Sequence, residues 1–241
     1  MSNHQLLASF INKSDRMVYK WIDYFEVYEK AFSAYRKKPV TFLEIGIQNG
    51  GSLQMWREFF GPEAKIIGID VDPQCKALEA EGFEIWIGDQ ADPAFWAEFK
   101  TKNPSIDLVL DDGGHTMVQQ IVTFQSLFPI LSNGGTYVCE DTHTSYFPSH
   151  GGGLNHQGSF HEYIKTMMDE MHAWYYAPLP TLHSSYFANN LYSIAMYDSI
   201  VVMEKRRKNP PIAFTRGFEG DIKNPPSMTY IELRHAFGIP D

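Results

Sequence analysis

The sequence predicts an α/β fold built on one parallel sheet. Short apolar runs alternate five times with stretches of helical periodicity, which is the pattern of strands joined by right-handed helical crossovers. The chain has 241 residues, of which 44% are apolar and 15% aromatic, enough to bury one sizeable core. Two further strand-like runs, separated by Asp198 and Ser199, indicate a hairpin at the end of the sheet.

The first predicted element is a helix over residues 17–35. Apolar residues recur there at spacings of three and four, as on one face of a helix. Ser14 and Asp15 are candidates for its N-terminal cap, and Pro39 ends it. Residues 1–39 are therefore interpreted as an N-terminal helical segment.

The strands that follow are nearly continuous apolar runs, typical of strands buried on both faces of a parallel sheet. They are predicted at residues 40–45, 65–69, 83–87, 106–110 and 136–139, with the hairpin strands at 191–197 and 200–205. Helices are predicted at residues 52–60, 73–81, 93–102, 116–131 and 160–174. Residues 40–205 thus form the main domain, which includes a lid loop at 141–159 rich in Gly, Ser, His and Asn, and residues 206–241 form an irregular tail.

Composition and charge argue against several classes of function. Lys and Arg total 20 against 29 Asp and Glu, a net charge of −9, so the sequence lacks the basic surface of a nucleic-acid-binding protein. No run of about 18 apolar residues occurs and the N-terminus does not resemble a signal peptide, so we expect neither a membrane span nor export. Cys75 and Cys139 lie too far apart for a metal or disulfide motif, which favours a reducing, cytoplasmic location.

A glycine-rich turn follows the first predicted strand, where the chain reads EIGIQNGGS from Glu44 to Ser52. Glycines at such a turn let the backbone approach a ligand and direct free N–H groups toward it, although they also occur in tight turns that bind nothing. The next strands end at Asp70 and at Asp89 with Gln90. Because the carboxyl ends of parallel strands meet at one edge, we expect these side chains and the glycine turn to converge on one crevice.

Three carboxylates are predicted to hold a metal ion. Asp112 follows the fourth strand, and Glu140 and Asp141 follow the fifth, so their side chains converge if these strands are neighbours. Mutual repulsion in a partly desolvated site would raise their pKa values unless a cation neutralised them. An all-oxygen donor set favours Mg²⁺ or Mn²⁺ over Zn²⁺. The alternative is that Asp111 or Asp112 caps the next helix and that Glu140 contacts the loop.

The glycine turn and the acids resemble the motifs of class I S-adenosylmethionine-dependent methyltransferases. In that family an acid two positions before the first glycine opens the cofactor loop, here Glu44, while Asp70 matches the ribose-binding acid and Asp89 a residue near the adenine. The resemblance implies a Rossmann-like fold: a mostly parallel seven-stranded sheet with an antiparallel last strand and helices on both faces. Gln48 stands where the family commonly has glycine. The implied cofactor-binding residues are Glu44, Gly46, Gln48, Asn49, Gly50, Ser52, Asp70, Asp89, Gln90 and Asp111.

The acids and a nearby histidine resemble the metal-dependent O-methyltransferases more closely. Catechol O-methyltransferases carry an acid after the fourth strand, a base three residues on and an acid pair after the fifth, the register of Asp112, His115, Glu140 and Asp141. The segments LEIGIQNGGSLQMW, GIDVDP, GDQADP, DLVLDDGGH and CEDTHTSYFPSHGGG resemble the macrolide-sugar O-methyltransferases of the mycinamicin and macrocin type, relatives of which are also called cephalosporin hydroxylase-like. The resemblance covers residues 14–205 and is strongest over 40–153.

These resemblances imply an enzyme that uses S-adenosylmethionine and Mg²⁺ or Mn²⁺ to methylate a hydroxyl of a small-molecule sugar or polyol. His115 would be the catalytic base, and His143 and Tyr146 of the lid would contact the substrate. Two alternatives remain: an iron- and 2-oxoglutarate-type hydroxylase, which needs two histidines and one carboxylate on its metal, and a non-catalytic cofactor-binding scaffold. The aromatic stripe from Trp21 to Tyr35 suits core packing or contact with a second copy, so a homo-oligomer also remains open.

Overall fold

The computed structural model describes residues 5–12, 16–175 and 186–209. A seven-stranded sheet with strand order β3-β2-β1-β4-β5-β7-β6 forms its centre. The first five strands are parallel and β7 is antiparallel to β5, which confirms the predicted sheet. The strands are β1 (Thr41–Ile45), β2 (Lys65–Asp70), β3 (Glu84–Ile87), β4 (Ile106–Asp111), β5 (Leu131–Cys139), β6 (Leu191–Tyr197) and β7 (Ile200–Lys205).

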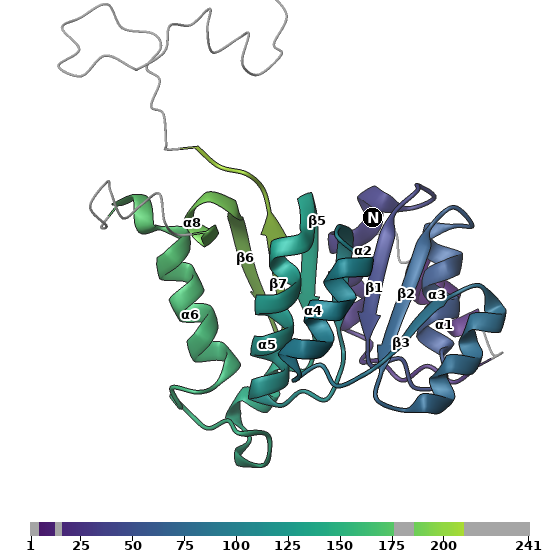
Figure 1. Cartoon of the computed structure of the whole chain (residues 1–241), viewed down its shortest axis with the longest axis horizontal. Helices are drawn as coiled ribbons and strands as arrows, with labels where there is room; N and C mark the ends of the chain where they lie inside the picture. Colours follow the sequence, from purple (N-terminus) through teal and green to yellow (C-terminus); the bar gives the residue numbers. More distant parts are fainter. Residues whose placement is uncertain (1–4, 13–15, 176–185, 210–241) are drawn as a thin grey trace, which may run out of the picture. The chain divides into compact units, whose positions relative to one another are not determined.

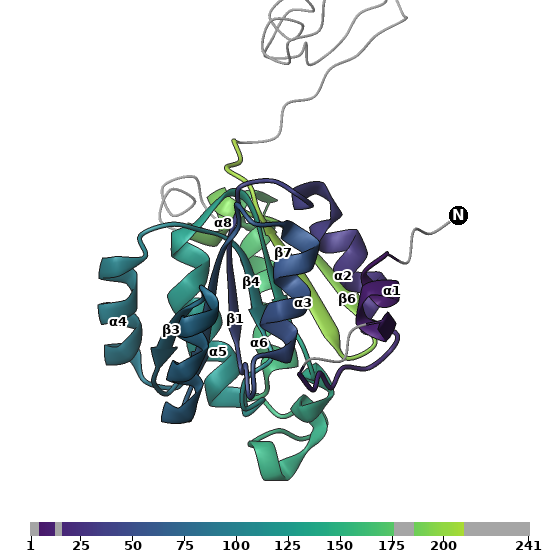
Figure 2. The same ribbon diagram turned by 90° about the vertical axis from the view of Figure 1, so that its right-hand side faces the viewer.

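Helices cover both faces of the sheet, as Figure 1 and Figure 2 show. One face carries α1 (Gln5–Asn12), α2 (Tyr24–Phe32) and α3 (Gly51–Phe60), and the other carries α4 (Pro93–Lys102), α5 (Met117–Leu127) and α6 (Phe160–Met171). The shorter elements are η1 (Ser33–Tyr35), η2 (Pro73–Glu81), η3 (Phe128–Ile130), η4 (Thr142–Tyr146), η5 (Pro148–His150), η6 (Ala173–Tyr175) and α8 (Tyr186–Asn190). This two-sided cover explains why the strands are continuous apolar runs.

Two apolar clusters form the core, one on each face of the sheet. On the α1–α3 face, Trp56 packs among aromatic rings, with the ring centroid of Phe42 at 5.1 Å and that of Tyr28 at 5.4 Å. On the other face, Phe124 of α5 stands edge-on to Tyr137 of β5 at 5.3 Å. Such aromatic pairs stabilise a core beyond the area they bury. The two clusters hold the strands in place, and with them the edge of the sheet where the loops begin.

The caps predicted from sequence account for the start of α4. Asp92 Oδ1 accepts a hydrogen bond from Ala94 N at 2.8 Å, and Pro93 takes the first helical position, where no N–H donor is needed. The segment at residues 73–81 also begins behind a capping aspartate but forms the 3₁₀ helix η2 rather than an α-helix. Only Cys75 and Leu78 of this segment are buried, so it lacks the apolar stripe that packs a regular helix against a sheet.

The helix predicted over residues 17–35 is wrong in its first part. Helix α2 begins at Tyr24, and residues 16–21, called here the strap, run without helical structure across the glycine turn. The backbone at Met17 packs closely on Gly51, and a side chain at position 51 would collide with the Met17 carbonyl group. At the far end of the strap, Lys20 contacts the buried carboxylates of Glu44 and Glu140. These tertiary contacts override the helical period of the local sequence.

Every described helix and strand belongs to one unit, which runs to Arg207. The predicted cap residues Ser14 and Asp15 and the predicted tail beyond residue 209 lie outside the described residues. Among the helices that the structure describes, none combines the length and the apolar character that crossing a bilayer requires.

Candidate active site

The carboxyl ends of β1, β2, β3, β4 and β5 meet at one edge of the sheet, the lower edge in Figure 1. The register places Ile45 of β1 beside Ile69 of β2 and Asp111 of β4. It also places Asp111 beside Cys139 of β5. The residues that immediately follow these strands therefore lie together, as the sequence predicted from the parallel sheet.

The glycine turn after β1 has the backbone that its sequence requires. Gly46 has a φ of +81°, and a side chain there would collide with the backbone carbonyl of Asp112. Gln48, which replaces the more common glycine, has a φ of +43° and so adopts the left-handed conformation that glycine favours. Its N–H donates to Asp70 Oδ2 at 2.9 Å and its carbonyl accepts from Cys75 Sγ at 2.9 Å. These two bonds hold a non-glycine residue in a conformation that costs free energy.

Asp70 at the end of β2 organises this turn. Its Oδ2 accepts from Ile47 N at 3.0 Å as well as from Gln48 N, and its Oδ1 accepts from Asp72 N at 3.0 Å. Asp70 and Gln48 both line two cavities, of about 220 Å³ and about 450 Å³. The smaller cavity is also lined by the glycines at the ends of β1, β3 and β4, with Asp112 at its border. A ligand there would meet backbone groups on several sides and the carboxylates of Asp70 and Asp112.

Three other predicted cofactor residues have structural partners of their own. Asp89 is exposed, and its Oδ1 accepts from Ala91 N at 2.8 Å. Gln90 lines the smaller cavity, and its Nε2 donates to Asp111 Oδ1 at 3.0 Å. Asp111 is buried and accepts from Tyr137 Oη at 2.9 Å, and burial raises its pKa to about 7. Asp111 therefore holds Gln90 in place from the protein interior and does not border the cavities beside Asp70.

Glu44 and Ser52 lie beneath the glycine turn. Glu44 is fully buried and accepts from Ser52 Oγ at 2.8 Å. Burial raises the pKa of Glu44 to about 7, against the lowering effect of the nearby Lys20 ammonium. Neither residue borders the two cavities beside Asp70. The remaining turn residues, Asn49 and Gly50, continue the loop into α3, with Asn49 lining the larger cavity and Gly50 at a φ of +78°.

The three predicted metal-binding carboxylates lie close together, but they have different partners. Glu140 is buried, and both its oxygens lie 3.1 Å from Lys20 Nζ. Tyr28 Oη of α2 donates a further hydrogen bond to Glu140 Oε1. Asp112 also pairs with Lys20 through Oδ2, which leaves its Oδ1 facing His115. Although burial alone would lower it, the charges of Asp112, Glu140 and Glu44 raise the pKa of Lys20 well above its usual value, so Lys20 is a cation.

Asp112, His115 and Asp141 form a second group on the solvent side of these contacts. His115 Nε2 lies 3.4 Å from Asp141 Oδ2 and 3.8 Å from Asp112 Oδ1. One donor atom from each of the three lies within 4.8 Å of the others. Asp141 Oδ1 also accepts from Tyr24 Oη at 2.6 Å. Burial lowers the pKa of His115, which favours its neutral form at neutral pH.

This second group fits a divalent cation. It offers two carboxylates and one imidazole that face one another and remain partly exposed. Carboxylate oxygens suit Mg²⁺ and Mn²⁺. An iron hydroxylase would require two histidines and one carboxylate, and the group has the opposite composition. His143 of the lid has another partner, since its Nδ1 lies 2.5 Å from Ser199 Oγ.

The predicted lid begins next to this group. Its first part forms η4 and η5, joined by hydrogen bonds from Gly152 N to Phe147 O and from Gly153 N to Ser145 O. The His143 ring stacks on Trp21 of the strap at 5.0 Å, with an interplanar angle of 16°. Tyr146 is 51% exposed. The lid and the strap therefore meet beside the site.

Three residues of the site were not predicted from the sequence: Lys20, Tyr24 and Tyr28. Tyr24 and Tyr28 are one helical turn apart on α2, so their hydroxyl groups reach neighbouring carboxylates. The available signal was the pair of tyrosines at a spacing of four, preceded by a lysine four residues earlier. Apolar periodicity assigns Tyr28 to the packing stripe and passes over Lys20 and Tyr24, so the polar ends of all three were not considered.

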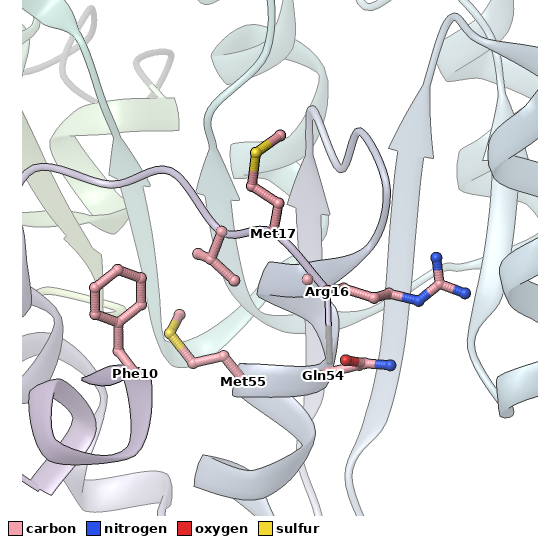
Figure 3. Close-up of a pocket in the computed structure, with 7 residues that line it drawn as sticks. Phe10, Arg16, Met17, Gln54 and Met55 are labelled. Atoms are coloured by element: carbon pink, nitrogen blue, oxygen red, sulfur yellow. The ribbon is translucent and has the colours of Figure 1, made fainter. Parts of the chain in front are cut away.

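The strap is anchored at its start as well as at Lys20. Arg16 donates to Asn49 O at 3.0 Å and pairs with Glu81 of η2. Figure 3 shows Arg16 and Met17 above Met55 of α3, around a cavity of about 360 Å³ that Phe10 of α1 also lines. The strap thus connects α1, the glycine turn and the acidic residues.

Comparison with known proteins gives the same family as the motifs. A tetracenomycin-sugar 3'-O-methyltransferase of Streptomyces olivaceus is 33% identical over 201 residues, which are 78% of this chain and 50% of that protein. The mycinamicin VI 2''-O-methyltransferase of Micromonospora griseorubida is 31% identical over 209 residues, 81% of this chain and 52% of that protein. The chain is a homologue of sugar O-methyltransferases. It spans about half the length of these relatives.

The fold of this O-methyltransferase homologue agrees with that relationship. The MycE methyltransferase of the mycinamycin pathway, solved in complex with Mg and SAH, superposes with a TM-score of 0.73 at 28% identity. The superposition covers 86% of this chain and 55% of MycE, and confirms the class I methyltransferase fold. No family model matches the sequence.

Proposed function

We propose that this chain transfers a methyl group from S-adenosylmethionine to a sugar hydroxyl of a glycosylated small molecule, with the aid of Mg²⁺ or Mn²⁺. The observation that carries the proposal is the position of Asp112. It borders the cavity formed by the glycine turn and Asp70, and it also belongs to the group with His115 and Asp141. A cofactor and an acceptor hydroxyl bound on either side of Asp112 would therefore be adjacent.

The residues at this edge suit both ligands. Asp70 has carboxylate oxygens at the cavity wall, where they would accept hydrogen bonds from ribose hydroxyl groups. Asp112 and Asp141 would hold the cation through their partly exposed carboxylates. When bound, S-adenosylmethionine supplies the methyl group and the cation makes the acceptor hydroxyl more acidic. MycE was solved with Mg and SAH, which supports the use of both ligands.

His115 is proposed as the base that removes the acceptor proton. Its pKa is lowered by burial, so its ring is a proton acceptor at neutral pH. Asp141 Oδ2, 3.4 Å from His115 Nε2, would stabilise the positive charge that the ring gains with the proton. Tyr24 donates to the other oxygen of Asp141 and so fixes its orientation. Proton removal and charge compensation would thus be supplied by neighbouring side chains.

The remaining contribution of the chain is to hold the reactants together and exclude water. The lid and the strap adjoin the site from two directions and meet where His143 stacks on Trp21. The exposed Tyr146 and Phe147 of the lid offer aromatic surface to an acceptor. Positioning of this kind accounts for a large part of the barrier reduction in a bimolecular transfer.

The test is methyl transfer from isotopically labelled S-adenosylmethionine to rhamnosylated tetracenomycin and to mycinamicin VI, followed by mass spectrometry. We expect a mass gain of one methyl group on the sugar, loss of turnover on chelation and recovery with Mg²⁺. The sugar-free aglycones are the control and should not react. Cofactor binding without methylation of any glycoside would argue for the scaffold alternative, and a hydroxylated product would argue for the hydroxylase.

A further inference from the structure

The segment η2 supports the glycine turn from the side of the larger cavity. Its two buried residues, Cys75 and Leu78, are three positions apart, and the three-residue repeat of a 3₁₀ helix places them on the same side. Cys75 Sγ donates to the carbonyl of Gln48 at 2.9 Å. A side chain at Gly50 would collide with Leu78, so Leu78 packs directly against that part of the turn. The 3₁₀ form of η2 thus brings both of its buried side chains onto one loop.

A closed ring of hydrogen bonds joins the turn to the start of η2. Gln48 N donates to Asp70 Oδ2, and Asp72 N donates to Asp70 Oδ1. Cys75 N donates to the carbonyl of Asp72 at 3.1 Å, and the Cys75 thiol donates to the carbonyl of Gln48. The peptide groups on both sides of Gln48 are therefore held, one by a carboxylate and the other by a thiol. Between them Gln48 keeps its φ of +43°.

The Cys75 thiol is suited to be a hydrogen-bond donor. Burial and the charges of Asp70 and Asp72 raise the pKa of Cys75 to about 11, so the thiol keeps its proton at neutral pH. Cys75 lines the larger cavity and not the smaller one, whereas Gln48 lines both. A cofactor in the smaller cavity would contact Gln48 but not the thiol. Any effect of Cys75 on cofactor binding must therefore act through Gln48.

We propose that Cys75 is a positioning residue of the cofactor site, and that its thiol and Gln48 act as a pair in place of the glycine that this methyltransferase family commonly has. The left-handed conformation costs a non-glycine residue free energy, and the bond to the Gln48 carbonyl offsets part of that cost. Without this bond the turn relaxes, and the wall that it gives to the smaller cavity moves. The inference rests on the proposed function only for the identity of the cofactor.

A double-substitution cycle tests the pair. Affinity for S-adenosylhomocysteine is measured by titration calorimetry on the full chain. Cys75→Ala removes the donor, and we expect it to weaken binding by at least about fivefold. In the Gln48→Gly protein the same substitution should weaken binding by no more than about twofold, because glycine adopts a positive φ without steric cost. The difference between the two losses is the coupling between the residues.

Cys75→Ser is the matched control, since it keeps a hydrogen-bond donor at the same position. Its affinity for S-adenosylhomocysteine should lie within about twofold of that of the unmodified chain. A residue that only fills space would give the same loss in both backgrounds, and serine would not restore binding. Equal losses from Cys75→Ala in the unmodified chain and in the Gln48→Gly protein would overturn the proposal, as would an unchanged affinity in Cys75→Ala.

The rate of thiol labelling gives a second measurement on the unmodified protein. Cys75 and Cys139 are both buried, and a reagent reaches the Cys75 sulfur only when its contact with Gln48 opens. Because coupling is reciprocal, saturating S-adenosylhomocysteine should slow the reaction of Cys75 with dithionitrobenzoate by at least about fivefold. Mass spectrometry identifies the labelled residue. An unchanged rate at Cys75 would overturn the proposal even if the Cys75 variants do not fold.

These results separate from those of the proposed function. Methyl transfer with equal losses in the two backgrounds would keep the function and overturn the pairing of Cys75 with Gln48. The expected coupling without methyl transfer would keep the pairing and remove the function. Failure of the unmodified chain to bind S-adenosylhomocysteine would overturn both.

Discussion

Asp70 is expected to stabilise both the glycine turn and the bound cofactor. The substitution Asp70→Ala tests both roles. The substitution removes the acceptor for three backbone N–H groups, those of Ile47, Gln48 and Asp72. It also removes the carboxylate from the wall of the two cavities beside the turn. The structure therefore predicts losses of stability and of cofactor affinity from one change.

The expected loss of stability follows from the number of hydrogen bonds. A net contribution of about 0.5 to 1.5 kcal/mol for each bond gives about 2 to 4 kcal/mol for the three. The lower part of this range applies, because the N–H groups of Gln48 and Asp72 are exposed and gain water in the variant. A loss of about 2 kcal/mol corresponds to a fall in Tm of about 4 to 8 °C in a domain of this size. Affinity for S-adenosylhomocysteine should fall by at least about 100-fold, because charge-assisted bonds to the ribose are lost as well.

Differential scanning calorimetry gives the first quantity and titration calorimetry the second. Asp92→Asn is the matched control: it removes a negative charge from a side chain that caps α4 and lines neither cavity. The control should bind S-adenosylhomocysteine within about threefold of the unmodified chain. An Asp70→Ala protein with unchanged Tm and unchanged affinity would refute the assignment of Asp70 to either role.

Three further predictions concern the turn, the buried acid and the base. Gly46→Ala should lower the free energy of unfolding by more than about 2 kcal/mol, against about 1 kcal/mol for Gly82→Ala. Both glycines have a φ near +80°, but only a side chain at position 46 would collide with the Asp112 backbone. Equal losses of stability in urea denaturation would contradict this. Burial raises the pKa of Asp111 to about 7, so the stability that this group contributes is lost as the pH rises toward and through that value. Asp111→Asn should therefore flatten the fall of Tm with pH. An unchanged dependence of Tm on pH in this variant would count against the raised pKa. His115→Ala should lower the rate of methyl transfer by about 10² to 10⁴ and should remove the acid limb of the pH profile, which the lowered pKa of His115 places below about pH 6.5. The affinity for Mn²⁺ should stay near that of the unmodified chain. A large loss of that affinity would make His115 a metal ligand and not a base.

The sheet and its functional edge could be predicted because buried parallel strands have a direct local signature. Continuous apolar runs gave the strands, and the residue after each run then had to lie at the carboxyl edge. The same reasoning placed Asp70, Asp112 and Asp141 at that edge. It did not determine the direction of each side chain: Asp111 and Asp112 are consecutive, so one faces the core and the other the site, and the sequence does not say which.

The strap could not be predicted from local pattern. Met17 and Trp21 continue the spacing of the α2 stripe, yet they are 68% and 44% exposed. The contact that decides the path of this segment joins Lys20 to Glu140, which are 120 residues apart in the sequence. Periodicity within a short window carries no information about such a contact. For the same reason no local pattern indicated that Glu140 has a lysine as its partner.

The separation of Lys20 from its partners also has a consequence for folding. Asp112 is 92 residues beyond Lys20 and Glu140 is 120 residues beyond it, so the lysine is synthesised long before these two acids. Contacts of such long sequence separation form late, after the loop-closure entropy has been offset by other contacts. Until β5 has joined β4, Glu44 and Glu140 must remain hydrated because no counter-charge is near. Burial of these acids is thus coupled to docking of the strap, and deleting residues up to Lys20 should yield a chain that forms the sheet but leaves its acidic edge open to water.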